Sequence, residues 1–189
     1  LKWTGDFENQ QRASKRLAQV VPVSIAIIFV ILFILFSNAR DAGLVLLNVP
    51  FAAAGGIIAL LITHFNFSIS AGIGFIALFG ICIQNGVIMI SGIKSNVRSH
   101  IPLSEAVKNT VRSRVRPVVM TAAMAAIGLM PAALSHGIGS ESQRPLAIVI
   151  IGGVLCDTFF TLFIFPLIVE VIYGKTLYDK EGKLRQRRV

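Results

Sequence analysis

Three polar side chains lie inside otherwise apolar stretches and are the candidates for chemistry in this sequence. Gln84 and Asn85 stand side by side in the middle of GFIALFGICIQNGVIMISGIK, and Asp157 follows GGVLC in a later apolar stretch. A carboxylate inside a membrane marks an ion or proton path by default. The plainer interpretation of Asp157 is a protonated side chain bonded to a neighbouring helix. Both interpretations require a bundle of helices around these residues, because buried polar groups need partners.

Other polar or sulfur-bearing side chains have plain explanations. The amides of Gln84 and Asn85 could serve only to bond one helix to another. Thr121 lies one turn into an apolar stretch, where a threonine hydroxyl commonly bonds its own helix backbone. Methionine thioethers could bind a soft ion, although their spacing here favours packing. The methionines are Met89, Met120, Met124 and Met130. No pattern indicates a nucleophile with its base, a metal-ligand set or a cofactor site, so we predict no catalytic residues, metal or cofactor.

The composition indicates a membrane protein. Of the 189 residues, 54% are hydrophobic and 14% are charged, and residues 42–93 contain no Asp, Glu, Lys or Arg. A soluble domain is about 45–50% apolar and about 25% charged. The net charge of +9 is concentrated beside apolar stretches, with six Lys or Arg in Lys94–Arg116 and six in Lys175–Arg188. This placement favours anionic membrane lipids as the partner and argues against nucleic acid.

Five apolar stretches are long enough to cross a hydrocarbon core of about 30 Å, which takes about 20 residues. We therefore predict an all-α integral membrane protein with a transmembrane domain at 17–172. The spans are expected at about 17–37, 42–63, 69–93, 117–134 and 145–172. An amphipathic helix at 102–114 is expected to lie along the interface, because its apolar and basic residues segregate. Pro50 is expected to kink the second span, and a basic tail follows at 173–189.

The distribution of basic residues predicts the orientation. The loops expected on one side of the membrane, 37–41 and 94–116, together with the tail hold thirteen Lys or Arg, whereas the other side holds five. Cytoplasmic loops carry the excess of Lys and Arg. The N-terminus is therefore predicted outside the cytoplasm and the C-terminus inside it.

The sequence contains the motifs GDFENQQRA, LNVPFAAAGG, GFIALFGICIQNGV, RSRVRPVVMTAAMAAIGLMP and a later GG with Pro166. Taken together, these motifs resemble those of the resistance-nodulation-division (RND) efflux pumps, in particular the heavy-metal efflux branch of cobalt–zinc–cadmium and copper–silver type. The resemblance implies the last five of twelve transmembrane helices, with residues 1–16 as a periplasmic-domain stub and membrane-entry helix. It also implies a proton-driven antiporter of the bacterial inner membrane. Such a pump is a homotrimer that needs its N-terminal half, a periplasmic adaptor and an outer-membrane channel.

The resemblance also assigns roles to residues. Arg114, in RxRP, and Thr121, in the MT pair, match proton-relay positions of the family. Gln84 stands where the multidrug branch has a lysine, with Asn85 beside it. Gln84 cannot carry that lysine's charge, and Asp157 replaces a small or hydroxyl residue. We predict that these five residues lie around one polar channel that faces the acidic residues of the pump's first half.

Other functions remain open from the sequence. LKWTGDFENQQ has neither an initial Met nor the features of a signal peptide, so we expect a fragment or truncated gene product that does not transport alone. An RND exporter of amphiphilic compounds or lipids is one alternative. A non-transporting remnant or accessory subunit of a split pump is another. An intramembrane enzyme is the weakest alternative, because Asp157 has no second catalytic acid.

Overall fold

The protein is a bundle of helices. A computed structural model describes residues 19, 22–137 and 140–174, and no strand occurs among them. The elements in order are the helix Pro22–Phe36, α2 (Ala39–Leu46), α3 (Asn48–Ile62), α4 (Ile69–Arg98), α5 (Leu103–Leu134), α6 (Ser140–Phe159), the π-helical η1 (Phe160–Ile164) and a last helical stretch at 165–174. The expected segments 1–16 and 175–189 lie outside this description.

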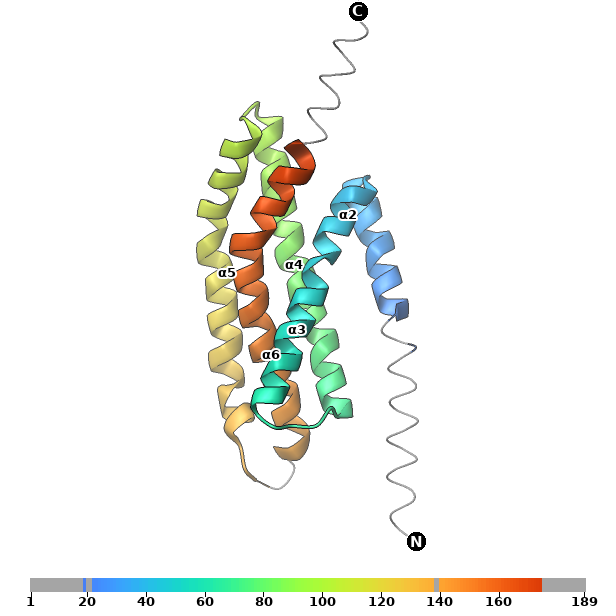
Figure 1. The fold of residues 1–189 in the computed structure, drawn as a ribbon, viewed down its shortest axis with the longest axis vertical. Helices are drawn as coiled ribbons and strands as arrows, with labels where there is room; N and C mark the ends of the chain where they lie inside the picture. The colour runs from blue at the N-terminus through green and yellow to red at the C-terminus, as the bar shows by residue number, and fades with distance from the viewer. Residues whose placement is uncertain (1–18, 20–21, 138–139, 175–189) are drawn as a thin grey trace, which may run out of the picture.

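The long helices stand side by side, and α6 contacts α3, α4 and α5 (Figure 1). The helix Pro22–Phe36 and α2 form a hairpin at the edge of the bundle (Figure 1). Among the described residues, four stretches are long and apolar enough to cross a membrane: Ala39–Ile62, Ile69–Arg98, Leu103–Leu134 and Ser140–Gly174. Pro22–Phe36 is a shorter apolar helix. These findings confirm an all-α, multi-pass membrane fold.

The second span bends where the sequence places a proline, but the break comes slightly earlier. α2 ends at Leu46 and α3 begins at Asn48, with Leu47 between them. Pro50 has no N–H to donate to the carbonyl of Leu46, and its ring crowds that carbonyl. The helix therefore breaks at Leu47, three residues before the proline, and Pro50 itself sits in the first turn of α3.

The predicted interfacial helix at 102–114 is not a separate element, because α5 runs without interruption from Leu103 to Leu134. Its first turns pack against the end of α4 instead of lying along a surface. Asn96 Nδ2 donates to the carbonyl oxygen of Ala106 at 3.3 Å and to Thr110 Oγ1 at 2.9 Å. Pro117 removes only one N–H from the helix. The apolar side of 102–114 is thus covered by α4. The segment therefore has no need to turn towards the membrane surface, and the helix continues past Pro117.

Glycines allow α6 to lie close to two helices at once. A Cβ on Gly152 would lie 2.3 Å from Ala59 Cβ of α3, and a Cβ on Gly153 would lie 2.1 Å from Leu78 Cδ2 of α4. On the facing helix, a Cβ on Gly55 would lie 2.3 Å from Cys156 Cβ. Small residues let membrane helices approach closely. The GG pair therefore sets the position of the next turn of α6, which carries Asp157.

The last span contains a widened turn. In η1, the N–H of Phe165 donates to the carbonyl of Phe160, five residues earlier. Pro166 follows directly, has no N–H, and would crowd the carbonyl four residues before it in a regular α-helix. The π-helical turn relieves that crowding and lets the helix continue at 165–174. Such turns are frequent at functional sites.

Candidate proton-relay site

Asp157 is fully buried where α6 packs against α4. Asn85 Nδ2 donates a hydrogen bond of 2.8 Å to Asp157 Oδ2. Thr161 Oγ1, one turn further along in η1, donates to Asp157 Oδ1 at 3.4 Å. Cys82, buried on α4 three residues before Asn85, borders the carboxyl group. The structure thus brings together two of the five predicted site residues, which we call the Asn85–Asp157 pair.

The two adjacent amides of α4 point in different directions. Asn85 is 5% exposed and faces α6, whereas Gln84 is exposed at the surface of this bundle. Neighbouring residues on an α-helix are about 100° apart, so only one of them can face a given partner helix. Gln84 has no side-chain hydrogen bond to any residue that the structure describes. Asn85 therefore bonds a buried group within this chain, whereas Gln84 contributes no such bond among the described residues.

Arg114 and Thr121 lie on α5, seven residues and about two turns apart, and so have similar facing. The hydroxyl of Thr121 donates to the carbonyl oxygen of Pro117 at 3.0 Å, the local bond that its position suggested. Arg114 is partly buried, and its Nε has no hydrogen-bond partner among the described residues. No hydrogen bond within 22–137 and 140–174 joins either residue to the Asn85–Asp157 pair. Their place in one channel with that pair stays a prediction.

Asn48 adds a buried polar side chain from a third helix, α3, next to the Asn85–Asp157 pair. It is fully buried at the start of α3, and its Nδ2 donates to the carbonyl oxygen of Cys82 at 3.5 Å. A Cβ on Gly86 would lie 2.8 Å from that Nδ2, so the glycine makes room for the amide. Asn48 Oδ1 has no partner among the residues described. Our sequence reasoning did not single out Asn48, although an amide in a charge-free stretch was the signal that identified Asn85.

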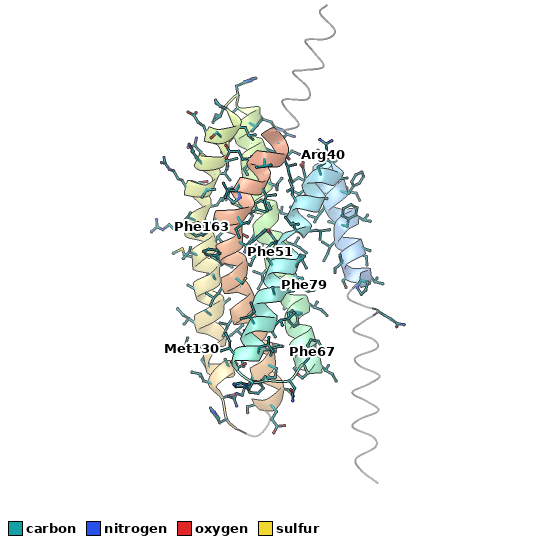
Figure 2. All side chains as sticks on the ribbon, in the orientation of Figure 1. Arg40, Phe51, Phe67, Phe79, Met130 and Phe163 are labelled. Carbon is teal, nitrogen blue, oxygen red and sulfur yellow. The ribbon has the colours of Figure 1, made fainter. Side chains whose placement is uncertain are left out.

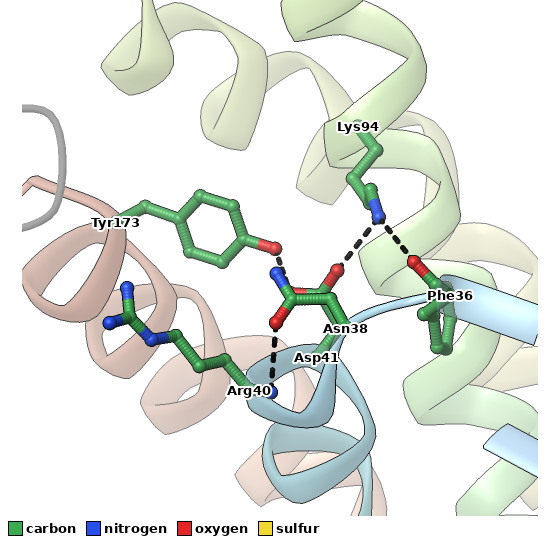
Figure 3. A network of polar contacts seen from close by, with 6 residues as sticks. All are labelled: Phe36, Asn38, Arg40, Asp41, Lys94 and Tyr173. Atoms are coloured by element: carbon green, nitrogen blue, oxygen red, sulfur yellow. Dashed lines mark hydrogen bonds and ion pairs between the residues drawn. The ribbon is translucent and has the colours of Figure 1, made fainter. Parts of the chain in front are cut away.

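A second polar cluster lies at one end of the bundle and was also missed (Figure 3). Lys94 Nζ lies 2.7 Å from Asp41 Oδ2 and donates to the carbonyl oxygen of Phe36 at 3.4 Å. The hydroxyl of Tyr173 donates to Asp41 Oδ1. Asp41 is 1% exposed. This Asp41 network joins the hairpin to α4 and to the C-terminal helical stretch.

Apolar side chains separate the two polar clusters. Met89 and Ile90 follow Asn85 on α4, and Phe160 and Phe165 follow Asp157 on the last span; all four are at most 1% exposed and belong to one core cluster. Lys94 and Tyr173 lie beyond them on the same two helices. Within the described residues, the Asn85–Asp157 pair is therefore insulated from the Asp41 network.

One of the four methionines is buried in the bundle, and the other three are exposed on α5. Met89 is fully buried, as packing requires, whereas Met120, Met124 and Met130 are 55%, 68% and 49% exposed on α5. For these three, a packing role in preference to metal binding stays a prediction. The described residues contain no group of three or more His, Cys, Asp or Glu side chains that could hold a metal ion.

A bundle of apolar helices with a buried carboxyl group at a helix–helix contact is a common arrangement in ion-coupled membrane transporters. The chain belongs to the AcrB/AcrD/AcrF family, whose sequence profile matches residues 1–173. This match confirms the resemblance to RND pumps that the motifs indicated.

The chain is similar to several heavy-metal efflux proteins. It is 44% identical over 175 residues to the cobalt-zinc-cadmium resistance protein CzcA of Cupriavidus metallidurans, covering 93% of this chain and 16% of that protein. It is 34% identical over 182 residues to the cation efflux system protein CusA of Escherichia coli K12, covering 90% of this chain and 17% of that protein. A crystal structure of a heavy metal efflux pump superposes with a TM-score of 0.80 at 45% identity, covering 89% of this chain and 16% of that one. The chain thus spans about a sixth of these relatives.

Proposed function

We propose that the chain is the C-terminal membrane part of a proton-driven pump that exports heavy-metal cations. The observation that carries this proposal is the similarity over nearly the whole chain to proteins named for cobalt, zinc, cadmium and other cation efflux. The names of these relatives favour metal cations over amphiphilic compounds as substrates. Because the chain spans about a sixth of their length, metal binding and the acidic residues of the first half belong to other parts of the pump.

The Asn85–Asp157 pair is suited to carrying a proton. An asparagine amide offers both a donor and an acceptor. Its NH₂ group bonds the ionised carboxylate, and its carbonyl oxygen can accept from the protonated form. Gain and loss of a proton at Asp157 therefore leave its main partner able to hydrogen-bond. In this proposal Arg114, Thr121 and Gln84 complete the route on the side facing the pump's first half.

The complete pump is expected to act as a homotrimer in the bacterial inner membrane, with a periplasmic adaptor and an outer-membrane channel. The N-terminus is expected in the periplasm and the C-terminus in the cytoplasm. Ser99 lies in the loop after α4, and Gly137 lies at the opposite end of the bundle, after α5. A cysteine at Gly137 should react with a membrane-impermeant maleimide in cells with a permeable outer membrane, and a cysteine at Ser99 should react only after the inner membrane is opened. The reverse pattern would invert the topology.

The relay is tested by proton-coupled metal transport in vesicles that contain the full-length protein. Asp157→Asn should shift the pH dependence of transport, and Arg114→Ala should abolish substrate-driven proton exchange while trimers still form. Glu170→Gln is the matched control, because it removes a carboxylate from the same span near its end and outside the Asn85–Asp157 pair. A pH profile of Asp157→Asn that equals that of Glu170→Gln and wild type would make Asp157 a structural residue. Normal exchange in Arg114→Ala would remove that residue from the relay.

A non-transporting accessory subunit gives a different result in the same vesicles. Full-length protein would then show no metal-dependent proton movement in any variant, wild type included.

A further inference from the structure

Three cations form a row along the outer face of α5. Lys108, Arg112 and Arg116 follow one another at intervals of four residues, and all three are exposed. Side chains four residues apart lie on the same side of a helix. None of the three has a hydrogen bond or ion pair with another described residue. Glu105, also exposed, lies about one turn farther from the centre of the helix.

The same face continues as an apolar strip. Val119, Met120, Ile127 and Met130 are 45%, 55%, 70% and 49% exposed. Met130 projects from the outer side of α5, away from the neighbouring helices (Figure 2). Of the most apolar 18-residue window of α5, 11% is buried, against 39% to 50% for the other three candidate spans. The span that carries this strip is thus the least buried of the four candidate spans.

The length of the apolar part of α5 places the three cations at the level of the lipid head groups. Residues 117–134 extend about 27 Å at about 1.5 Å per residue, close to the hydrocarbon thickness of about 30 Å. Arg116 therefore falls at the level where hydrocarbon gives way to head groups, and Lys108 lies about 12 Å farther out. Long basic side chains at such a boundary extend towards the head groups.

We propose that this face of α5 binds an anionic phospholipid. The phosphate of the head group lies among Lys108, Arg112 and Arg116, and an acyl chain lies along the strip from Val119 to Met130. The occupant follows from charge complementarity, since three uncompensated cations stand directly above uncharged apolar surface. A protein segment would have to supply acidic side chains at one level and an apolar face below it, whereas an anionic phospholipid has both parts in one molecule.

The test uses the full-length protein that contains this chain, purified in a neutral detergent, with lipid binding followed by native mass spectrometry. Dioleoyl phosphatidylglycerol is the anionic probe, and dioleoyl phosphatidylcholine has the same chains with a neutral head group. Removing a cation near an anionic lipid weakens binding about fivefold. Lys108→Gln/Arg112→Gln/Arg116→Gln should therefore weaken the tightest phosphatidylglycerol binding on the order of 100-fold. Binding of phosphatidylcholine should change less than twofold, roughly, because that lipid carries no net charge.

Two controls separate this site from general attraction. Arg98→Gln removes an exposed cation of α4 at the same end of the bundle and should leave phosphatidylglycerol binding unchanged. Glycerol phosphate has the anionic head without chains and should not compete with the lipid. The proposal is overturned if the triple variant binds phosphatidylglycerol as wild type does, if Arg98→Gln has an equal effect, or if glycerol phosphate displaces the lipid. It is also overturned if phosphatidylglycerol with a photoactivatable acyl chain fails to label the strip from Val119 to Met130, because another part of the pump would then cover the strip.

Discussion

Replacing Gly152 by alanine tests whether the close contact of α3 and α6 holds the bundle together. The new Cβ would lie 2.3 Å from Ala59 Cβ and 3.0 Å from the carbonyl oxygen of Gly55, and a backbone atom cannot turn aside. Overpacking of a fitted contact costs about 1–3 kcal/mol, and these distances place Gly152→Ala near the upper end. A Gly→Ala change inside a helix returns up to about 1 kcal/mol. The expected net loss is about 2 kcal/mol, or roughly a 30-fold smaller ratio of folded to unfolded protein.

Gly43→Ala is the matched control, because a Cβ on Gly43, inside α2, would meet no atom within 4 Å. That variant should be as stable as wild type or slightly more stable. The measurement is the fraction of full-length protein that keeps its size-exclusion profile in detergent after heating. Equal heat resistance of the Gly152 and Gly43 variants would refute the argument from close packing, since the same chemical change would then have the same effect in crowded and in open surroundings.

Four further variants test polar groups of the same bundle, each through the heat resistance of the full-length protein. Lys94→Met should lower it by the equivalent of about 1–3 kcal/mol, because it leaves the buried Asp41 carboxylate without its cation, and adding Asp41→Asn should restore part of the loss. Asn85→Ala should cost about 1–3 kcal/mol by removing the donor to a buried carboxyl group, and a wild-type value would contradict the 2.8 Å bond. Gln84→Ala should lower heat resistance less than Asn85→Ala does, because Gln84 has no side-chain hydrogen bond to a residue that the structure describes. Thr121→Val should do the same, since it removes only a local bond to its own helix.

The sequence predicted the helices well because long apolar runs admit few other structures in a membrane. Its errors lie where packing between distant segments decides the outcome. The residues of 102–114 show that the segment has an apolar side, but they do not show whether the end of α4 or lipid covers it. The Asn96–Thr110 hydrogen bond joins the two helices across a short loop, and the position of that contact depends on how far α4 extends. Single-sequence periodicity carries no such information.

The candidate site was predicted in part for the same reason. Asn85 and Asp157 were each singled out as costly polar groups in apolar stretches, but their contact joins residues 72 positions apart. Asn48 carried the same signal and was overlooked. Lys94 was counted only as part of a basic segment, and its pairing with Asp41 depends on a hairpin geometry that composition does not contain.

The polar groups of this chain fall into those that it satisfies itself and those that it leaves for a partner. Asp157 receives hydrogen bonds from Asn85 and Thr161 inside the described bundle, so its burial needs no help from the pump's first half. Arg114 has a buried Nε without a partner among the residues described, and Gln84 is exposed. A buried guanidinium atom without an acceptor is unfavourable, which makes Arg114 the group whose environment changes most when the first half docks. Arg114→Ala should therefore impair proton exchange in the complete pump without preventing trimer formation, whereas the folding of this half should depend more strongly on Asp157.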